Sequence, residues 1–217
     1  MEDIILIGCG QHCGVVTYNV KEQGKYNIVG ILDADESKTS ATVLGHKVLG
    51  NYDATTLERI KNTYHTNKFF ISFGAMKYRK SVFEYMRNQG WEAVNIIHPN
   101  AIVPPSVKLG QGVLIECGCL ITPNPVIGDN VVVNTGSQIN HDNVIGNHVF
   151  IAGGVILSGG VTIKENSLID DGVIVALGKT VGANSVVGAG AVVVKDLPDG
   201  VVAYGNPAKI IRPNDKW

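Results

Sequence analysis

The chain has 217 residues, a net charge of −1, and a composition that is 45% hydrophobic and 17% charged. This balance is typical of a globular protein of one or two domains, and because no basic run is present we expect neither nucleic acid nor an anionic membrane as a partner. No apolar stretch reaches the length of a membrane span, and the start, Met1-Glu2-Asp3, lacks the basic region of a signal peptide, so we expect a cytoplasmic protein.

The first hundred residues alternate strand and helix patterns. We expect strands at 3–8, 27–33, 68–74 and 93–97, and helices at 11–23, 54–63 and 76–89. Strands that alternate with helices predict a parallel sheet, so this part is expected to be an α/β, Rossmann-like domain. His98-Pro99 then interrupts the pattern, which places the domain boundary between residues 1–97 and 98–217.

A glycine-rich turn follows the first expected strand. Gly8 and Gly10 would let the backbone approach a phosphate, and the next helix would offer free N–H groups there. Asp33 ends the second strand, where an acid commonly binds a ribose or a base edge, and His12 is expected to touch the nucleotide or to cap the helix. A plain tight turn is the alternative. Because a domain of this size has little room for a full NAD site, we expect a mononucleotide or a nucleotide sugar.

The four cysteines predict no metal site. Cys9 and Cys13 are spaced C-x3-C, and Cys117 and Cys119 are spaced C-x-C, neither of which fits a zinc pattern. In a cytoplasmic protein they would be reduced, so we interpret them as small, buried or half-buried residues.

An aliphatic residue then recurs at every sixth position from Val103 to Val193. We call these aliphatic residues anchors. The three residues that end on each anchor suit a short strand, and the next three residues are rich in Gly, Asn, Asp and Ser, which form turns. A short strand and a corner, repeated without slippage, predict an all-β solenoid. The pattern resembles that of the hexapeptide acyltransferases, which implies a left-handed parallel β-helix with three units, or eighteen residues, in each coil.

One corner carries chemistry. His141 lies two places after its anchor and has Asp142 beside it, so a neutral imidazole could act as a base with a carboxylate that fixes its tautomer. Eighteen residues on, Gly159 would lie on the same corner of the next coil and offer its N–H to an oxyanion. A solvated turn histidine is the alternative for His141. His148 has no adjacent acid and is the weaker candidate.

The segment from Asn134 to Gly146, the motif at 160–163 and the tail motif Gly205-Asn206-Pro207-Ala208-Lys209 together resemble the sugar O-acyltransferase family. This resemblance covers almost the whole chain. It implies a homotrimer that binds acetyl-CoA between neighbouring helices, with His141 as base, Asp142 as its orienting acid and Gly159 as the oxyanion donor. Lys209 and Arg212 could then meet CoA phosphates. The family's second histidine, nine residues after the base, is replaced here by Phe150.

We therefore expect an acetyl-CoA-dependent N-acetyltransferase that acts on a UDP- or GDP-linked amino sugar. Three alternatives stay open at this point. The acceptor could be a hydroxyl of sialic acid or another sugar. A zinc-dependent hydratase related to carbonic anhydrase would need three histidines around the metal, and the repeat offers only His141 and His148. A non-catalytic nucleotide-binding scaffold would bind ligand without turnover.

Overall fold

The structure, a computed structural model, describes residues 1–216 and divides into two compact units. The N-terminal unit is Met1–Ile96, and the C-terminal unit begins at Ile97. Within residues 1–216, no helix is both long and apolar enough to cross a membrane.

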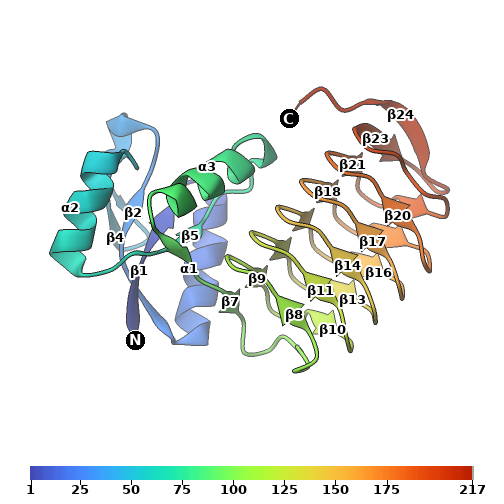
Figure 1. The fold of residues 1–217 in the computed structure, drawn as a ribbon, viewed down its shortest axis with the longest axis horizontal. Helices are drawn as coiled ribbons and strands as arrows, with labels where there is room; N and C mark the ends of the chain where they lie inside the picture. The colour runs from blue at the N-terminus through green and yellow to red at the C-terminus, as the bar shows by residue number, and fades with distance from the viewer. Residues whose placement is uncertain (217) are drawn as a thin grey trace. The chain divides into compact units, whose positions relative to one another are not determined.

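The N-terminal unit contains a six-stranded sheet in the order β3-β4-β2-β1-β5-β6. Strands β1, β2, β4 and β5 of this sheet are labelled in Figure 1. The strands are β1 (Glu2–Ile7), β2 (Tyr26–Leu32), β3 (Thr42–Val43), β4 (His46–Gly50), β5 (Lys68–Ile71) and β6 (Glu92–Ala93). The helices are α1 (Gln11–Gln23), η1 (Glu36–Lys38), α2 (Ala54–Tyr64) and α3 (Met76–Asn88). All neighbouring strands are parallel except the β3–β4 pair. The expected α/β architecture is thus confirmed.

Strand β1 lies at the centre of this sheet because its run Ile4–Ile7 is apolar on both faces and fully buried. On one face, Ile5 and Ile7 pack in a cluster with Leu57 and Ile60 of α2 and with residues of α3. The carboxyl ends of β1 and β2 therefore lie side by side, with Ile7 paired to Leu32. This edge positions the glycine-rich turn next to Asp33.

In this unit one hairpin was not predicted, and one predicted strand was wrong. The β3–β4 hairpin was missed because its two-residue turn is Leu44-Gly45, with φ of 52° and 82°, and leucine is a poor residue for a left-handed position. The single strand expected at 93–97 is in fact two strands. Ala93 pairs with Phe69 in the first sheet, whereas β7 (Ile96–Ile97) joins a sheet of the β-helix, so the chain leaves one sheet for another within four residues.

The C-terminal unit is a left-handed parallel β-helix with three sheets. Sheet one holds β10 (Leu120–Ile121), β13 (Gln138–Ile139), β16 (Ile156–Leu157), β19 (Ile174–Val175) and β22 (Val192–Val193). Sheet two holds β8 (Lys108–Leu109), β11 (Val126–Ile127), β14 (Val144–Ile145), β17 (Thr162–Ile163) and β20 (Thr180–Val181). Sheet three holds β7, β9 (Leu114–Ile115), β12 (Val132–Val133), β15 (Phe150–Ile151), β18 (Leu168–Ile169), β21 (Val186–Val187), β23 (Val201–Tyr204) and β24 (Lys209–Pro213).

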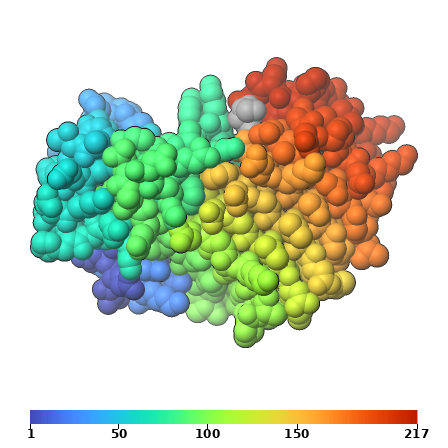
Figure 2. Space-filling view, viewed as in Figure 1, coloured from blue at the N-terminus to red at the C-terminus, as the bar shows by residue number. Residues whose placement is uncertain are grey.

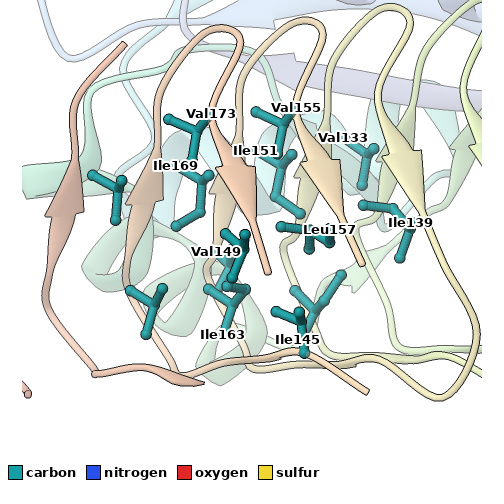
Figure 3. Close-up of a cluster of buried hydrophobic side chains, with 14 of the residues drawn as sticks. Val133, Ile139, Ile145, Val149, Ile151, Val155, Leu157, Ile163, Ile169 and Val173 are labelled. Atoms are coloured by element: carbon teal, nitrogen blue, oxygen red, sulfur yellow. The ribbon is translucent and has the colours of Figure 1, made fainter. Parts of the chain in front are cut away.

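Strand residues of successive coils pair eighteen positions apart, as in Gln138↔Ile156 and Val144↔Thr162, and the last coil pairs sixteen positions apart, as in Val186↔Val202. In each two-residue strand the second side chain points inward. These anchors, with the preceding aliphatic residues such as Val149 and Val155, form one continuous buried core (Figure 3). In the space-filling view the coils, coloured from green to red, follow one another in order along a solid body (Figure 2). The antiparallel pair β23–β24 closes the last coil.

The corners explain the turn residues of the repeat. From Gly112 to Gly190, every sixth residue has a positive φ between 53° and 75°, and each of these residues is Gly, Asn, Asp or His. Such backbone angles are rare for other residues, because the Cβ atom approaches the carbonyl oxygen. Asp142 (φ 60°) and His148 (φ 61°) occupy this left-handed position in their corners, whereas His141 lies one place before it.

Candidate active site

His141 lies at the corner between β13 and β14, on an edge of the β-helix. Its Nδ1 is 2.9 Å from Oδ2 of Asp142, and the two side chains are 61% and 59% exposed. Because an ionised carboxylate can only accept, Nδ1 carries the proton and Nε2 is left as the acceptor. The imidazole is therefore held in the tautomer that a general base needs, while its reactive nitrogen stays open to a ligand.

Asp142 is itself held in place. Its Oδ1 accepts a hydrogen bond of 3.1 Å from Nδ2 of Asn124, which stands eighteen residues earlier on the same corner. The hydrogen bond with His141, followed by the one from Asn124, lowers the pKa of the Asp142 carboxyl. Asp142 is thus a carboxylate at neutral pH, and it can stabilise an imidazolium when His141 takes up a proton.

Gly159 lies directly beside the His141 ring. A Cβ atom at position 159 would stand 2.5 Å from both Cε1 and Nε2 of His141, so only glycine leaves room for the ring in this position. The Gly160 N–H donates to the His141 carbonyl at 2.9 Å, which fixes the two corners to each other. Within residues 1–216 the Gly159 N–H donates to no acceptor. The arrangement therefore combines a base with an open amide donor beside it, which is suited to acyl transfer.

The second histidine of the repeat, His148, serves the fold. It is 5% exposed, and its Nδ1 is 3.1 Å from Nδ2 of Asn130 in the coil before it. In the coils that follow, Asn166 and Asn184 occupy the same corner position and hydrogen-bond to each other at 2.8 Å. His148 is thus one member of a buried polar ladder, and the structure does not bring it to the His141 corner.

In the N-terminal unit, a cavity of about 370 Å³ opens at the carboxyl ends of β1 and β2. Its lining includes Gly8, Gly10 and Asp33, three of the four residues that the sequence predicts for nucleotide binding. The rest of the lining is formed by Ala34, Lys38, Tyr52, Phe73, Ala75 and Tyr78. Helix α1 begins directly after Gly10 and has no side-chain cap, so the positive end of its dipole lies at this turn. Aromatic rings and a helix N-terminus together suit a nucleotide.

Asp33 ties the glycine-rich turn to the end of β2. Its carboxylate accepts hydrogen bonds from the N–H and the thiol of Cys9, at 2.8 and 3.0 Å. Burial opposes ionisation of Asp33, but the hydrogen bonds from Cys9, Asp35 and Lys38 outweigh it and lower its pKa. Burial, and then the adjacent Asp33 carboxylate, raise the pKa of Cys9 to about 11. The thiol is therefore protonated at neutral pH and acts as a donor.

His12, the fourth predicted residue, is not among the residues that line this cavity. It lies in the first turn of α1, where burial, and then the positive charge of Arg79, lower its pKa to about 4. His12 is therefore neutral at pH 7 and cannot supply a positive charge to a phosphate.

Arg79 of α3 is a residue that the sequence analysis missed. It is fully buried, and Nη1 donates to the carbonyl of Phe73 at 2.6 Å. Burial lowers the pKa of Arg79 to about 9. The Phe73 ring covers Gly8, where a Cβ atom would stand 2.6 Å from Cδ1, so Arg79 supports one wall of the cavity. The available signal was a charged residue on the apolar face of α3, three residues after Met76 and three residues before Val82.

The tail residues Lys209 and Arg212 lie on β24. Lys209 is exposed, and Arg212 pairs with Asp215 at 3.0 Å. The structure therefore places Lys209 at the surface, where it can meet an anionic ligand, and pairs Arg212 within the tail.

The four cysteines are free thiols, and Cys13 and Cys119 are buried.

The family described as the PglD N-terminal domain matches residues 3–86. No curated protein matches the chain. Among solved structures, the chain is 35% identical to PerB from Caulobacter crescentus in complex with CoA and GDP-perosamine, with a TM-score of 0.90 over 97% of this chain and 98% of that chain. The H141A mutant of GDP-perosamine N-acetyltransferase from the same organism gives the same identity and TM-score, over 97% of both chains. The acetyltransferase domain of PglB from Neisseria gonorrhoeae FA1090, in complex with acetyl coenzyme A, is 31% identical, with a TM-score of 0.86 over 97% of this chain and 99% of that chain.

Proposed function

Since the chain belongs to the PglD-like family of hexapeptide-repeat acetyltransferases, we propose that it transfers the acetyl group of acetyl-CoA to the amine of a nucleotide-linked amino sugar. The observation that carries this proposal is the His141 corner. There an imidazole with a free Nε2 is held by Asp142 and packs against the backbone of Gly159.

The geometry supports a direct transfer. The amine nitrogen attacks the thioester carbonyl carbon, and the C–N bond forms as the carbonyl oxygen becomes an oxyanion. The Gly159 N–H stabilises this oxyanion, and Nε2 of His141 takes the proton that the amine loses. When the intermediate collapses, the carbonyl re-forms and the C–S bond breaks, and Nε2 of His141 gives its proton to the sulfur, so that CoA leaves as the thiol and the neutral imidazole is restored. Asp142 stabilises the imidazolium in between, since its lowered pKa keeps it charged.

We assign nucleotide binding to residues 1–97 and acyl transfer to residues 98–217. The cavity beside Gly8 and Gly10 supports the first assignment, because the N-terminal end of the α1 dipole suits a diphosphate and the aromatic lining suits a base. PerB binds GDP-perosamine, so a GDP-linked amino sugar is the first substrate to test, with its UDP counterpart as the second.

We also propose a homotrimer in which acetyl-CoA binds between neighbouring β-helices. Apolar side chains point outward from the two sheets that meet at the His141 corner. Leu120 and Ile174 on sheet one are each 38% exposed, and Val126 and Val144 on sheet two are 43% and 47% exposed. Such stripes favour burial against another copy of the chain. A neighbour on either sheet would border the corner and give the acyl donor a second wall, with Lys209 available to its phosphates.

The experiment is a thiol-release assay with acetyl-CoA and each amino-sugar nucleotide. General base catalysis contributes about 10²- to 10⁴-fold, so His141→Asn should lower kcat by that factor. His148→Asn is the matched control, since it is the same substitution seven residues away, and should leave kcat unchanged. A full rate in His141→Asn would remove this residue from the mechanism. Release of thiol with sialic acid but not with the amino sugars would replace the proposed acceptor by a hydroxyl.

A further inference from the structure

The carboxylate of Asp33 has no acceptor site left for a ligand. Its Oδ2 accepts from the Cys9 N–H and thiol, at 2.8 and 3.0 Å. Its Oδ1 accepts from the Asp35 N–H at 3.0 Å and from the Lys38 ammonium at 3.3 Å. A carboxylate offers about two lone-pair sites on each oxygen, so four donors saturate it. A ribose hydroxyl could bind Asp33 only by displacing one of them.

Lys38, in contrast to Asp33, still has hydrogen-bonding capacity for a ligand. Its ammonium carries three N–H donors, and it meets Asp33 at 3.3 Å and Asp35 at 3.7 Å. Its side chain lines the 370 Å³ cavity and is 42% exposed, whereas that of Asp33 is 13% exposed. Lys38 is the one cationic residue among those that line this cavity. A donor is thus available at the position where Asp33 can no longer accept.

We propose that Lys38, rather than Asp33, contacts the ribose of the bound nucleotide by donating a hydrogen bond to a hydroxyl oxygen, while Asp33 holds Lys38 and the glycine-rich turn in place. This inference rests on the proposed function, because it deepens the same nucleotide site. In parallel sheets of this kind, the phosphates lie at the first glycine-rich turn and the ribose lies at the end of the second strand. Asp33 and Lys38 stand at that second position, directly after β2 and in η1.

A carboxylate and an ammonium bind a ribose hydroxyl in different ways. A carboxylate needs the proton of the hydroxyl, whereas an ammonium needs only a lone pair on its oxygen. Removal of Lys38 should therefore abolish discrimination between a ribonucleotide and its 2′,3′-dideoxy analogue. Removal of the Cys9 thiol should tighten ribonucleotide binding only if Asp33 is the true acceptor, because that change frees one of its lone pairs.

The test is the dissociation constant of GDP and of 2′,3′-dideoxy-GDP, measured by calorimetry, with UDP and its dideoxy analogue in parallel. A hydrogen bond to a charged group favours the ribonucleotide by about 10-fold in the wild-type protein. Lys38→Met should bind both nucleotides equally, and Lys38→Arg should restore the preference because it keeps a donor. Lys47→Met, which removes an exposed lysine of β4, is the matched control and should keep the wild-type ratio.

The readout is the ratio of the dissociation constants of the dideoxynucleotide and the ribonucleotide, because loss of the Lys38 charge weakens binding of both diphosphates alike. A preference that persists in Lys38→Met overturns the inference, and so does tighter ribonucleotide binding by Cys9→Ala. If neither GDP nor UDP binds the wild-type protein, the nucleotide assignment of the N-terminal unit itself fails. That result differs from the failure of Lys38 alone, in which the wild-type protein binds nucleotide and only the variant ratios disagree.

Discussion

Substitution of Gly159 by alanine tests how closely the His141 ring must be held. The new Cβ atom would stand 2.5 Å from Cε1 and Nε2, whereas ordinary contacts begin at 3.4 Å, so the ring must retreat by about 1 Å. Gly159 does not have a positive φ, so alanine fits its backbone. The amide N–H is kept as well. Because the ring is 61% exposed, it can move at little cost to folding.

We therefore expect Gly159→Ala to separate activity from stability. A 1 Å misplacement of a catalytic group can cost about 100-fold in rate, whereas a Gly→Ala change at a compatible position shifts the free energy of unfolding by less than about 1 kcal/mol. The assay is kcat by thiol release, with Tm from calorimetry. Gly153→Ala is the control, since Gly153 is another corner glycine without a positive φ. Its Cβ would meet an Asp171 carboxylate oxygen at 3.3 Å and the Thr135 carbonyl oxygen at 3.6 Å, neither of which requires a large shift. An unchanged kcat in Gly159→Ala would refute the reasoning, as would a loss that follows Tm.

Three further predictions concern the supporting structure. His148→Ala should lower the free energy of unfolding by about 2–4 kcal/mol in urea titrations, because it breaks a buried hydrogen bond at a position with a positive φ. His148→Asn should lower it by less than about 1 kcal/mol, because asparagine occupies the same position in other coils. A similar result for both variants would argue against the ladder. Arg79→Met should lower Tm and weaken GDP binding, both measured by calorimetry, because the Phe73 carbonyl loses its hydrogen-bond donor and the Phe73 ring over Gly8 is held less firmly. An unchanged affinity for GDP would show that the Phe73 ring keeps its position without Arg79. Hydrogen bonds lower the pKa of Asp33 against the opposing effect of burial, so its contribution to stability is present above its ordinary pKa of 3.8 and is lost as the pH falls through the lower, folded value. Asp33→Asn should therefore flatten the dependence of Tm on pH below about pH 4, and an unchanged acid limb would contradict this.

The β-helix could be predicted almost completely from the sequence. Successive strands of the β-helix pair eighteen residues apart, which is the coil length that the resemblance to the hexapeptide acyltransferases implies. Counting by that length placed Gly159 beside His141. The same six-residue regularity explains the backbone of the corners, since Gly, Asn and Asp recur at the positions where a positive φ recurs. What counting could not give is the tautomer of His141, which depends on how the Asp142 side chain turns.

The N-terminal unit was only partly predictable. Its helices and central strands followed from apolar periodicity, but the Leu44-Gly45 hairpin and the division of 93–97 did not, because a tight turn and a change of sheet leave no periodic signal. Gly8 and Gly10 were predicted from the glycine-rich turn and Asp33 from the end of the second strand, and all three line the cavity. Lys38 and Arg79 were not predicted. Neither residue belongs to a motif, and each gains its role from partners on other elements.

The sequence by itself determined the two-part architecture and the six-residue repeat, because apolar periodicity is a local property of the chain. The resemblance to the hexapeptide acyltransferases added the eighteen-residue coil that places Gly159 at the His141 corner. Only the tertiary structure decided that Asp33 is saturated by donors from Cys9, Asp35 and Lys38, and that Arg79 is buried behind Phe73. Those contacts join segments of unrelated sequence at the edge of a sheet, where the packing of the whole unit, and no local pattern, sets which polar groups meet.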